Sequence, residues 1–164
     1  GIINFDAHFD LRPVKTKPNS GTPFNQILKE NNNVDYFVIG IQQQSNTKEL
    51  FKIALEKKVS YVSNFECETF SEVLKNKLNT FIKEVDYLYI TIDLDGFSSA
   101  YAPGVSAPSP LGFTPHFAYK VLAFLFKSKK VISLDIAELN PDFDIDENTA
   151  NLAAKIIDYM ILNT

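Results

Sequence analysis

The sequence predicts an α/β fold of three layers, in which helices cover both faces of a mainly parallel sheet. Apolar runs suited to strands alternate along the chain with helical patterns, and the inner runs are apolar on both faces. Such runs are typical of parallel strands buried between helices. The chain has 164 residues, of which 45% are hydrophobic, and this is enough for one globular domain with a core.

The chain opens on a strand at residues 1–5, an apolar run that ends at an acidic motif. Residues 11–22 are expected to form a loop, because they contain two prolines, a Ser-Gly pair and few apolar side chains. A short helix follows, with Thr22 as its N-cap and Pro23 at its first position, where the missing N–H of proline costs nothing.

The next two strands are the apolar runs at residues 35–41 and 59–62. Between them, Asn46 is expected to cap a helix that extends to about residue 57. This strand–helix–strand order is the unit from which parallel sheets are built.

A longer amphipathic helix is predicted from Thr69 or Ser71 through Lys83. Its apolar side chains recur at helical spacing: Phe70, Val73, Leu74, Leu78, Phe81 and Ile82. The fourth strand, at residues 88–92, is strongly apolar and ends at a second acidic motif.

A long loop at residues 96–113 follows and contains three prolines. Loops of this length inside a compact domain are usually functional. The remaining elements are, in order, a helix at 115–126 opened by Thr114 and Pro115, a strand at 131–136, and a helix at 147–162 capped by Asp146.

Acidic side chains collect where two of the strands end. Asp6, His8 and Asp10 alternate after the first strand. Asp93 and Asp95 do so after the fourth. Alternate residues of an extended chain point to one side, and ligands bind at the carboxyl ends of parallel strands. Buried carboxylates need partners, so the pattern predicts a divalent-cation site rather than two solvated acidic loops. Carboxylates with one imidazole suit Mn²⁺ better than Zn²⁺ or Fe²⁺, and two such ions would make hydroxide from water near neutral pH.

Two further charged residues accompany this cluster. Glu138 lies just past the fifth strand, so a third strand delivers an acidic group to the same edge; the alternative is a surface charge near a helix start. Arg12 is the only arginine in the chain and lies two residues beyond Asp10. Its planar guanidinium can bind a carboxylate through two parallel bonds, although an ion pair that balances the acidic cluster is the alternative.

Composition excludes several classes of function. The net charge of −4 provides no basic face for nucleic acid, and no apolar stretch is long enough to span a bilayer. The single cysteine, Cys67, cannot form an internal disulfide, which suits a reducing compartment such as the cytoplasm. Because Cys67 is flanked by Glu66 and Glu68, we expect a packing residue rather than a reactive thiol.

Four motifs occur in order along the chain: Asp-Ala-His-Phe-Asp, Thr-Ile-Asp-Leu-Asp, Ala-Pro-Gly-Val-Ser-Ala-Pro and Ala-Glu-Leu-Asn-Pro. From residue 6 to about residue 153, their order and spacing resemble those of the ureohydrolases, the arginase and agmatinase superfamily. Asp-Ala-His-Phe-Asp-Leu-Arg, Ser-Gly-Thr-Pro-Phe and Gly-Val-Ser-Ala-Pro most resemble the formimidoylglutamase branch of that superfamily.

The resemblance implies a binuclear manganese hydrolase that cleaves the C–N bond of a linear amidine. N-formimidoyl-L-glutamate would yield L-glutamate and formamide, a step of histidine degradation. Two Mn²⁺ ions per complete subunit would hold a bridging hydroxide as the nucleophile. An arginase- or agmatinase-type guanidino hydrolase is one alternative, and a non-catalytic metal-binding homologue is another. The resemblance also implies a cytoplasmic homo-oligomer.

The resemblance assigns roles to the acidic cluster. Asp6 and Asp93 would bridge the two ions, because a carboxylate has two oxygens to share. Asp10 would bind one ion and assist proton transfer. His8 and Asp95 would bind the other ion.

The resemblance also assigns substrate contacts. Glu138 would hold the amidinium group by charge-assisted bonds and orient its carbon to the nucleophile. Arg12 would bind a carboxylate of the glutamate moiety. Ser20 would contact the amino-acid part of the substrate, although it equally suits a turn beside Gly21.

The chain departs from the superfamily in three places. No Gly-Gly-Asp-His motif, whose histidine binds one metal, precedes Gly1, and His116 at a helix start is no substitute. We therefore expect residues 1–164 to be the C-terminal portion of a longer single domain, incomplete at the N-terminal side of its sheet and inactive alone. Ser98 replaces a third aspartate of arginases, and Thr22-Pro23-Phe24 lies where arginases have a proton-shuttle histidine. The serine at position 98 weakens the arginase alternative, and without the histidine the proton for the leaving amine would have to come from water or another group.

Overall fold

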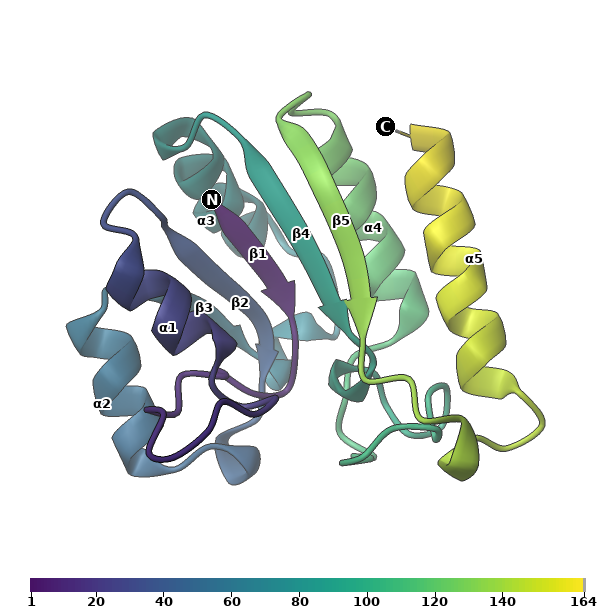
Figure 1. Cartoon of the computed structure of the whole chain (residues 1–164). Helices are drawn as coiled ribbons and strands as arrows, with labels where there is room; N and C mark the ends of the chain where they lie inside the picture. Colours follow the sequence, from purple (N-terminus) through teal and green to yellow (C-terminus); the bar gives the residue numbers. More distant parts are fainter. Residues whose placement is uncertain (164) are drawn as a thin grey trace.

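The computed structural model describes residues 1–163 of the predicted domain, and its last residue, 164, lies outside the described residues. Five strands form one sheet in the order β3-β2-β1-β4-β5 (Figure 1). They are β1 (Ile2–Phe5), β2 (Tyr36–Ile41), β3 (Ser60–Ser63), β4 (Leu88–Asp93) and β5 (Val131–Ala137). Each strand is parallel to its neighbours, so all carboxyl ends lie along one edge.

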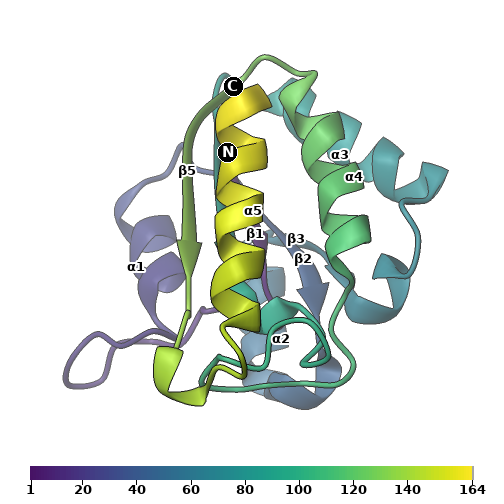
Figure 2. The ribbon, with the colours of Figure 1, turned by 90° about the vertical axis from the view of Figure 1, so that its right-hand side faces the viewer.

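Helices cover both faces of the sheet, as predicted. One face packs against α1 (Pro23–Glu30) and α2 (Lys48–Glu56). The opposite face packs against α3 (Glu72–Glu84), α4 (Pro115–Phe126) and α5 (Asn148–Asn163), as Figures 1 and 2 show. The three-layer α/β/α class is therefore confirmed. No helix within residues 1–163 is both long and apolar enough to cross a membrane.

The central strands are buried on both faces. Every residue of β1 and β2 is buried, and so is every residue of β4 except the half-buried Tyr89. β5 differs because it lies at the edge of the sheet, and its side chains at Ile132, Asp135 and Ala137 are exposed. In Figure 1 no helix lies in front of β4 and β5, so the cover of this face is uneven.

The amphipathic pattern of α3 is confirmed for four of the six predicted side chains, whereas Phe70 lies before the start of the helix and Val73 departs from the pattern. Ser71 opens the helix, and its hydroxyl accepts the Leu74 N–H at 3.2 Å. The buried side chains are Leu74, Leu78, Phe81 and Ile82. Val73 is 64% exposed, so its predicted place on the apolar face is wrong. Val73 directly precedes Leu74 on the helix, and a turn of 3.6 residues carries consecutive side chains to different faces.

The predicted cap of α2 is wrong by one residue. The N-cap is Thr47, whose hydroxyl accepts the Leu50 N–H at 3.4 Å. Asn46 instead turns its amide toward the loop after β1, where it binds backbone groups. At α1, Thr22 does occupy the N-cap position before Pro23, but its side chain caps nothing and bonds Asn19.

The predicted cap of α5 is also wrong. Asp146 does not cap the helix, which begins at Asn148. The carboxylate of Asp144 accepts the N–H groups of Thr149 and Ala150, each at 2.9 Å. These bonds lower the pKa of Asp144. An anion at the positive end of a helix dipole is favourable, so Asp144 fixes the start of α5.

We predict that Asp144→Ala destabilises the domain by about 1 kcal/mol, because it removes the acceptor for two helix N–H groups. The matched control is Asp142→Ala at an exposed neighbour, whose described hydrogen bond uses only its backbone N–H. Urea unfolding followed by circular dichroism measures both variants. Equal losses of stability in the two variants would contradict the assignment.

Candidate metal centre

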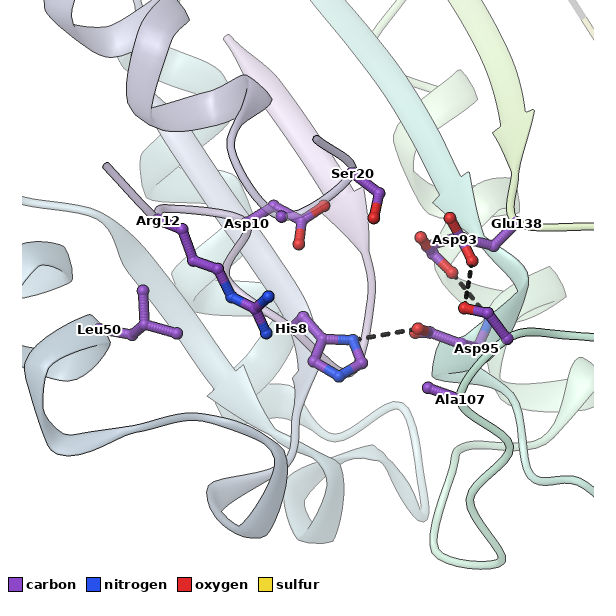
Figure 3. A pocket seen from close by; sticks show the side chains of 11 residues that line it. His8, Asp10, Arg12, Ser20, Leu50, Asp93, Asp95, Ala107 and Glu138 are labelled. Atoms are coloured by element: carbon purple, nitrogen blue, oxygen red, sulfur yellow. Dashed lines mark hydrogen bonds and ion pairs between the residues drawn. The ribbon is translucent and has the colours of Figure 1, made fainter. Parts of the chain in front are cut away.

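The ends of β1 and β4 bring the acidic motifs together. Phe5 pairs with Ile92, so Asp6 and Asp93 leave adjacent strands side by side. Asp93 in turn pairs with Ala137, which places Glu138 at the next strand end. His8, Asp10, Asp93, Asp95 and Glu138 line a common pocket of about 220 Å³. In Figure 3, His8 and Asp10 approach this pocket from one side, and Asp93, Asp95 and Glu138 approach it from the other.

The five predicted ligand residues form two groups of three. Asp6, His8 and Asp95 make one group, and Asp6, Asp10 and Asp93 make the other. Within each group, one ligand atom from each residue lies within 4.8 Å of the others. Asp6 belongs to both groups, which suits a bridging carboxylate. Asp93 belongs to one group, so its bridging role stays a prediction.

Short hydrogen bonds fix the turn that follows β1. Asp6 Oδ1 accepts the His8 backbone N–H at 2.6 Å. The imidazole Nδ1 of His8 lies 3.0 Å from Asp95 Oδ2 and 3.4 Å from Asp6 Oδ1. On the β4 side, Asp93 Oδ1 accepts the Asp95 N–H at 2.9 Å. Each acidic motif therefore orients its own carboxylate through a backbone N–H two residues later.

Two residues of the pocket have a left-handed backbone. The φ angle is 52° at Asp10 and 67° at Glu138. Such angles are uncommon for residues with side chains, and they concentrate at functional sites. The two residues predicted to be catalytic are thus both held in a backbone conformation that costs free energy.

Burial and mutual repulsion change the ionisation of the cluster. Burial, together with the charge of Asp6, raises the pKa of Asp10 to about 8. Burial and the neighbouring Asp6 and Asp95 raise the pKa of Asp93 to about 10. Hydrogen bonds to Asp6 and Asp95 raise the pKa of His8 to about 11. A bare cluster therefore holds protons at neutral pH, and a bound cation would take their place.

The donor set fits a hard divalent cation. Asp95 Oδ1 is buried and has no hydrogen-bond partner among the described residues. A buried carboxylate oxygen without a partner is costly, and a cation is a natural partner for it. Four carboxylates with one imidazole match Mn²⁺, which favours oxygen ligands.

Asn46 supports the ligand turn, and our reading of the sequence missed it. Its Oδ1 accepts the Phe9 N–H at 3.0 Å, and its Nδ2 donates to Ala7 O at 2.9 Å. Nδ2 also donates to Gln42 O at 2.8 Å. Asn46 thus ties the backbone on both sides of His8 to the loop after β2. The sequence contains no signal for this contact, because it joins residues far apart along the chain.

Arg12 and Ser20, the predicted substrate contacts, both line the pocket. Both are exposed, and Arg12 forms no ion pair with any of the described residues. A Cβ added at Gly21 would lie 3.0 Å from Arg12 Cδ, so the glycine makes room for the arginine stem. Asn19 holds the adjoining turn by accepting the Gly21 N–H at 3.0 Å. The substrate contacts of Arg12 and Ser20 stay predictions.

Ser106 is a further pocket residue that the prediction did not single out. Its hydroxyl donates to Glu138 Oε2 at 2.6 Å, and both residues line the pocket. The signal available in the sequence was the place of Ser106 in the Gly-Val-Ser-Ala-Pro motif of the long loop, since long loops inside a compact domain are usually functional. This bond fixes one oxygen of Glu138 and leaves the other toward the pocket.

Three residues discussed from the sequence lie apart from the ligand groups. His116 is exposed, so it is a surface residue as expected. Cys67 is buried and bonds Ser63 O at 3.2 Å, and burial raises the pKa of its thiol, which makes it a packing residue. Ser98 is buried and its hydroxyl donates to Pro110 O at 3.0 Å, so it holds the long loop together.

Known proteins resemble this chain throughout its length. A sequence model of the arginase family matches residues 1–162. The chain is 44% identical over 163 residues to a formimidoylglutamase of Staphylococcus haemolyticus (strain JCSC1435), a match that covers 99% of this chain and 52% of that protein. A formimidoylglutamase of Staphylococcus aureus (strain JH9) is also 44% identical, over 164 residues, with 98% and 52% covered. The chain thus spans about half the length of these curated relatives, 52% in each case.

Solved structures share the fold. A formimidoylglutamase from Bacillus subtilis superimposes with a TM-score of 0.91 at 24% identity, covering 99% of this chain and 52% of that one. A formiminoglutamase of Trypanosoma cruzi with Mn²⁺ superimposes with a TM-score of 0.87 at 22% identity, covering 99% and 56%. These structures share the three-layer α/β/α fold of this chain. Because the family match extends over nearly all residues, the chain belongs to the arginase family.

Proposed function

We propose that this chain carries the manganese centre of a hydrolase that cleaves the C–N bond of a linear amidine. The observation that carries the proposal is the pair of three-residue ligand groups that share Asp6 at the ends of β1 and β4. Relatives named formimidoylglutamase favour N-formimidoyl-L-glutamate as the substrate and L-glutamate and formamide as the products. Residues 1–164 would then be a portion of one catalytic domain.

The chain's own residues would bind two Mn²⁺ ions and move protons. Asp6 and Asp93 would be shared between the ions, Asp10 would bind one ion, and His8 and Asp95 would bind the other. When bound, the ions supply a hydroxide nucleophile near neutral pH. Asp10 would accept a proton from the attacking group, because its carboxylate lines the pocket beside the other ligand residues.

Three side chains would position the substrate. Glu138, held at one oxygen by Ser106, would bind the amidinium and orient its carbon. Arg12 has no carboxylate partner among the described residues, so its guanidinium is available for a carboxylate of the glutamate moiety. Ser20 would contact the amino-acid part, since the neighbouring turn is already held by Asn19. Homo-oligomerisation and a cytoplasmic location stay predictions from the sequence.

The direct test is an assay of the complete natural protein with Mn²⁺ and N-formimidoyl-L-glutamate. We expect formamide release, two Mn²⁺ per chain by metal analysis, and a loss in kcat/KM of more than about 100-fold in Asp6→Asn, since even outer partners of metal ligands contribute ~10–100-fold. The exposed His116→Ala is the control and should be unchanged. Urea release from arginine or agmatine without formamide release would favour the guanidino hydrolase. Absence of bound Mn²⁺ would favour a non-catalytic homologue.

Arg12→Ala separates the proposed substrate from guanidino compounds. The variant should raise KM for N-formimidoyl-L-glutamate at least ~10-fold, because a charged hydrogen bond contributes about 1.5–3 kcal/mol. Any residual turnover of agmatine, which has no carboxylate, should not change. Arg12→Lys is the matched control and should recover part of the loss, because it keeps the charge but not the planar fork. Equal losses on both substrates would disprove this role.

The raised pKa values predict how stability depends on pH. In the folded chain the pKa of Asp10 is raised from 3.8 to about 8, and the pKa of His8 is raised from 6.5 to about 11. Between these values the folded state binds more protons than the unfolded state, so stability must fall as pH rises. The two windows overlap from pH 6.5 to about 8. Mn²⁺ competes with these protons, so its stabilising effect should grow over the same interval.

Thermal unfolding at pH 6, 7 and 8, in EDTA and in Mn²⁺, measures this effect. The expected result is a Tm that declines with pH in EDTA and a difference between the two conditions that widens. Asp10→Asn removes one titrating group and should flatten the decline in EDTA. A metal-free Tm that rises through this interval would be inconsistent with the ionisation described for the cluster.

A further inference from the structure

Asn4 lies beneath Asp6, the carboxylate that we propose is shared between two ions, and it has no role in the proposed reaction. Asn4 lies on β1, and Asp6 follows it by two residues just past the end of the strand, so both side chains point to the same side. Asn4 is 1% exposed, and its Nδ2 donates to Asp6 Oδ2 at 2.8 Å. The other oxygen of Asp6 accepts the His8 N–H at 2.6 Å. Each oxygen of this carboxylate therefore accepts a hydrogen bond from the protein.

The bond from Asn4 is part of a buried chain of hydrogen bonds. Asn4 Nδ2 also donates to the hydroxyl of Tyr36 at 2.9 Å, and this hydroxyl donates to Phe9 O at 3.2 Å. Asn4 and Tyr36 thus connect Asp6 to Phe9, which lie on either side of His8 in the ligand turn. Both N–H bonds of the amide are used, and the side chain is locked in one orientation.

We propose that Asn4 is a positioning residue that sets the plane of the Asp6 carboxylate for sharing between two cations. The inference rests on the proposed function. A bridging carboxylate directs one lone pair of each oxygen to an ion, and the remaining lone pairs need donors. Asn4 Nδ2 donates to one oxygen of Asp6, and the His8 N–H donates to the other. These two hydrogen bonds prevent rotation of the carboxylate. An amide suits the task because it donates hydrogen bonds without adding charge to the cluster.

The competing explanation is that Asn4 only satisfies buried polar groups. A merely structural asparagine would lower stability when replaced but would leave the cation affinity of the folded chain unchanged. The chain offers a matched control in Asn64, which is 6% exposed and donates from Nδ2 to Leu111 O at 2.9 Å. Asn64 forms no described hydrogen bond to a ligand residue.

The experiment compares Asn4→Leu with Asn64→Leu in the complete natural protein, because leucine has the branched shape of asparagine without its donors. Manganese electron paramagnetic resonance measures the Kd for Mn²⁺, and circular dichroism confirms that each variant is folded at the temperature used. We expect the Kd to rise at least ~10-fold in Asn4→Leu, the range for outer partners of metal ligands, and less than about 2-fold in Asn64→Leu. Asn4→Thr is the second variant, to be used if Asn4→Leu does not fold. Threonine suits a strand, and its side chain is too short to reach Asp6, so the Kd for Mn²⁺ should rise to the same extent.

An unchanged Kd in a folded Asn4 variant, or equal changes at Asn4 and Asn64, would overturn the inference while leaving the proposed function intact. Failure of the unsubstituted complete protein to bind Mn²⁺ would overturn both. The two ideas therefore fail in distinguishable ways.

Discussion

Mutual repulsion among buried carboxylates is the constraint on which this structure depends. Asp6, Asp93 and Asp95 are each less than a tenth exposed, and Asp10 lies close enough to share their field. Solvent does not screen these buried charges, so bound protons or cations must neutralise them. The parallel register of β1 and β4 creates the problem by placing two distant motifs side by side, and the same register makes the centre possible.

Neutral polar groups hold the charged ones in place. Asn4, Asn46 and Tyr36 are buried around the turn after β1, and none of them adds charge to it. Ser106 does the same for Glu138 across the pocket. The predicted ligand side chains thus depend on a surrounding layer of amides and hydroxyls. Most of that layer comes from β1, β2 and the long loop at residues 96–113.

The sequence predicted the five strands, the five helices and the convergence of the ligands, because these follow from local periodicity and from the rule for parallel strand ends. It predicted the cap at Thr114 and named Ser71 as one of two candidates, but it misplaced the caps of α2 and α5. Asn46 resembles a cap, yet its amide binds the distant Ala7 O, and Thr47 and Asp144 accept the helix N–H groups instead. The supporting bonds of Asn46 and Ser106 were not predicted, because each joins residues that lie far apart along the chain. Pairing of β1 with β4 brought the predicted ligands together, whereas the substrate contacts of Arg12 and Ser20 depend on a molecule that no sequence pattern describes.

The left-handed backbone at Asp10 and Glu138 has an evolutionary consequence. Glycine would adopt these φ angles without strain, so replacing either residue by glycine would relieve local tension in the native fold. It would also delete the carboxylate. Under the proposed function, selection for thermal stability and selection for turnover would therefore act in opposite directions at these two positions, and a more stable variant would need its stabilising substitutions elsewhere.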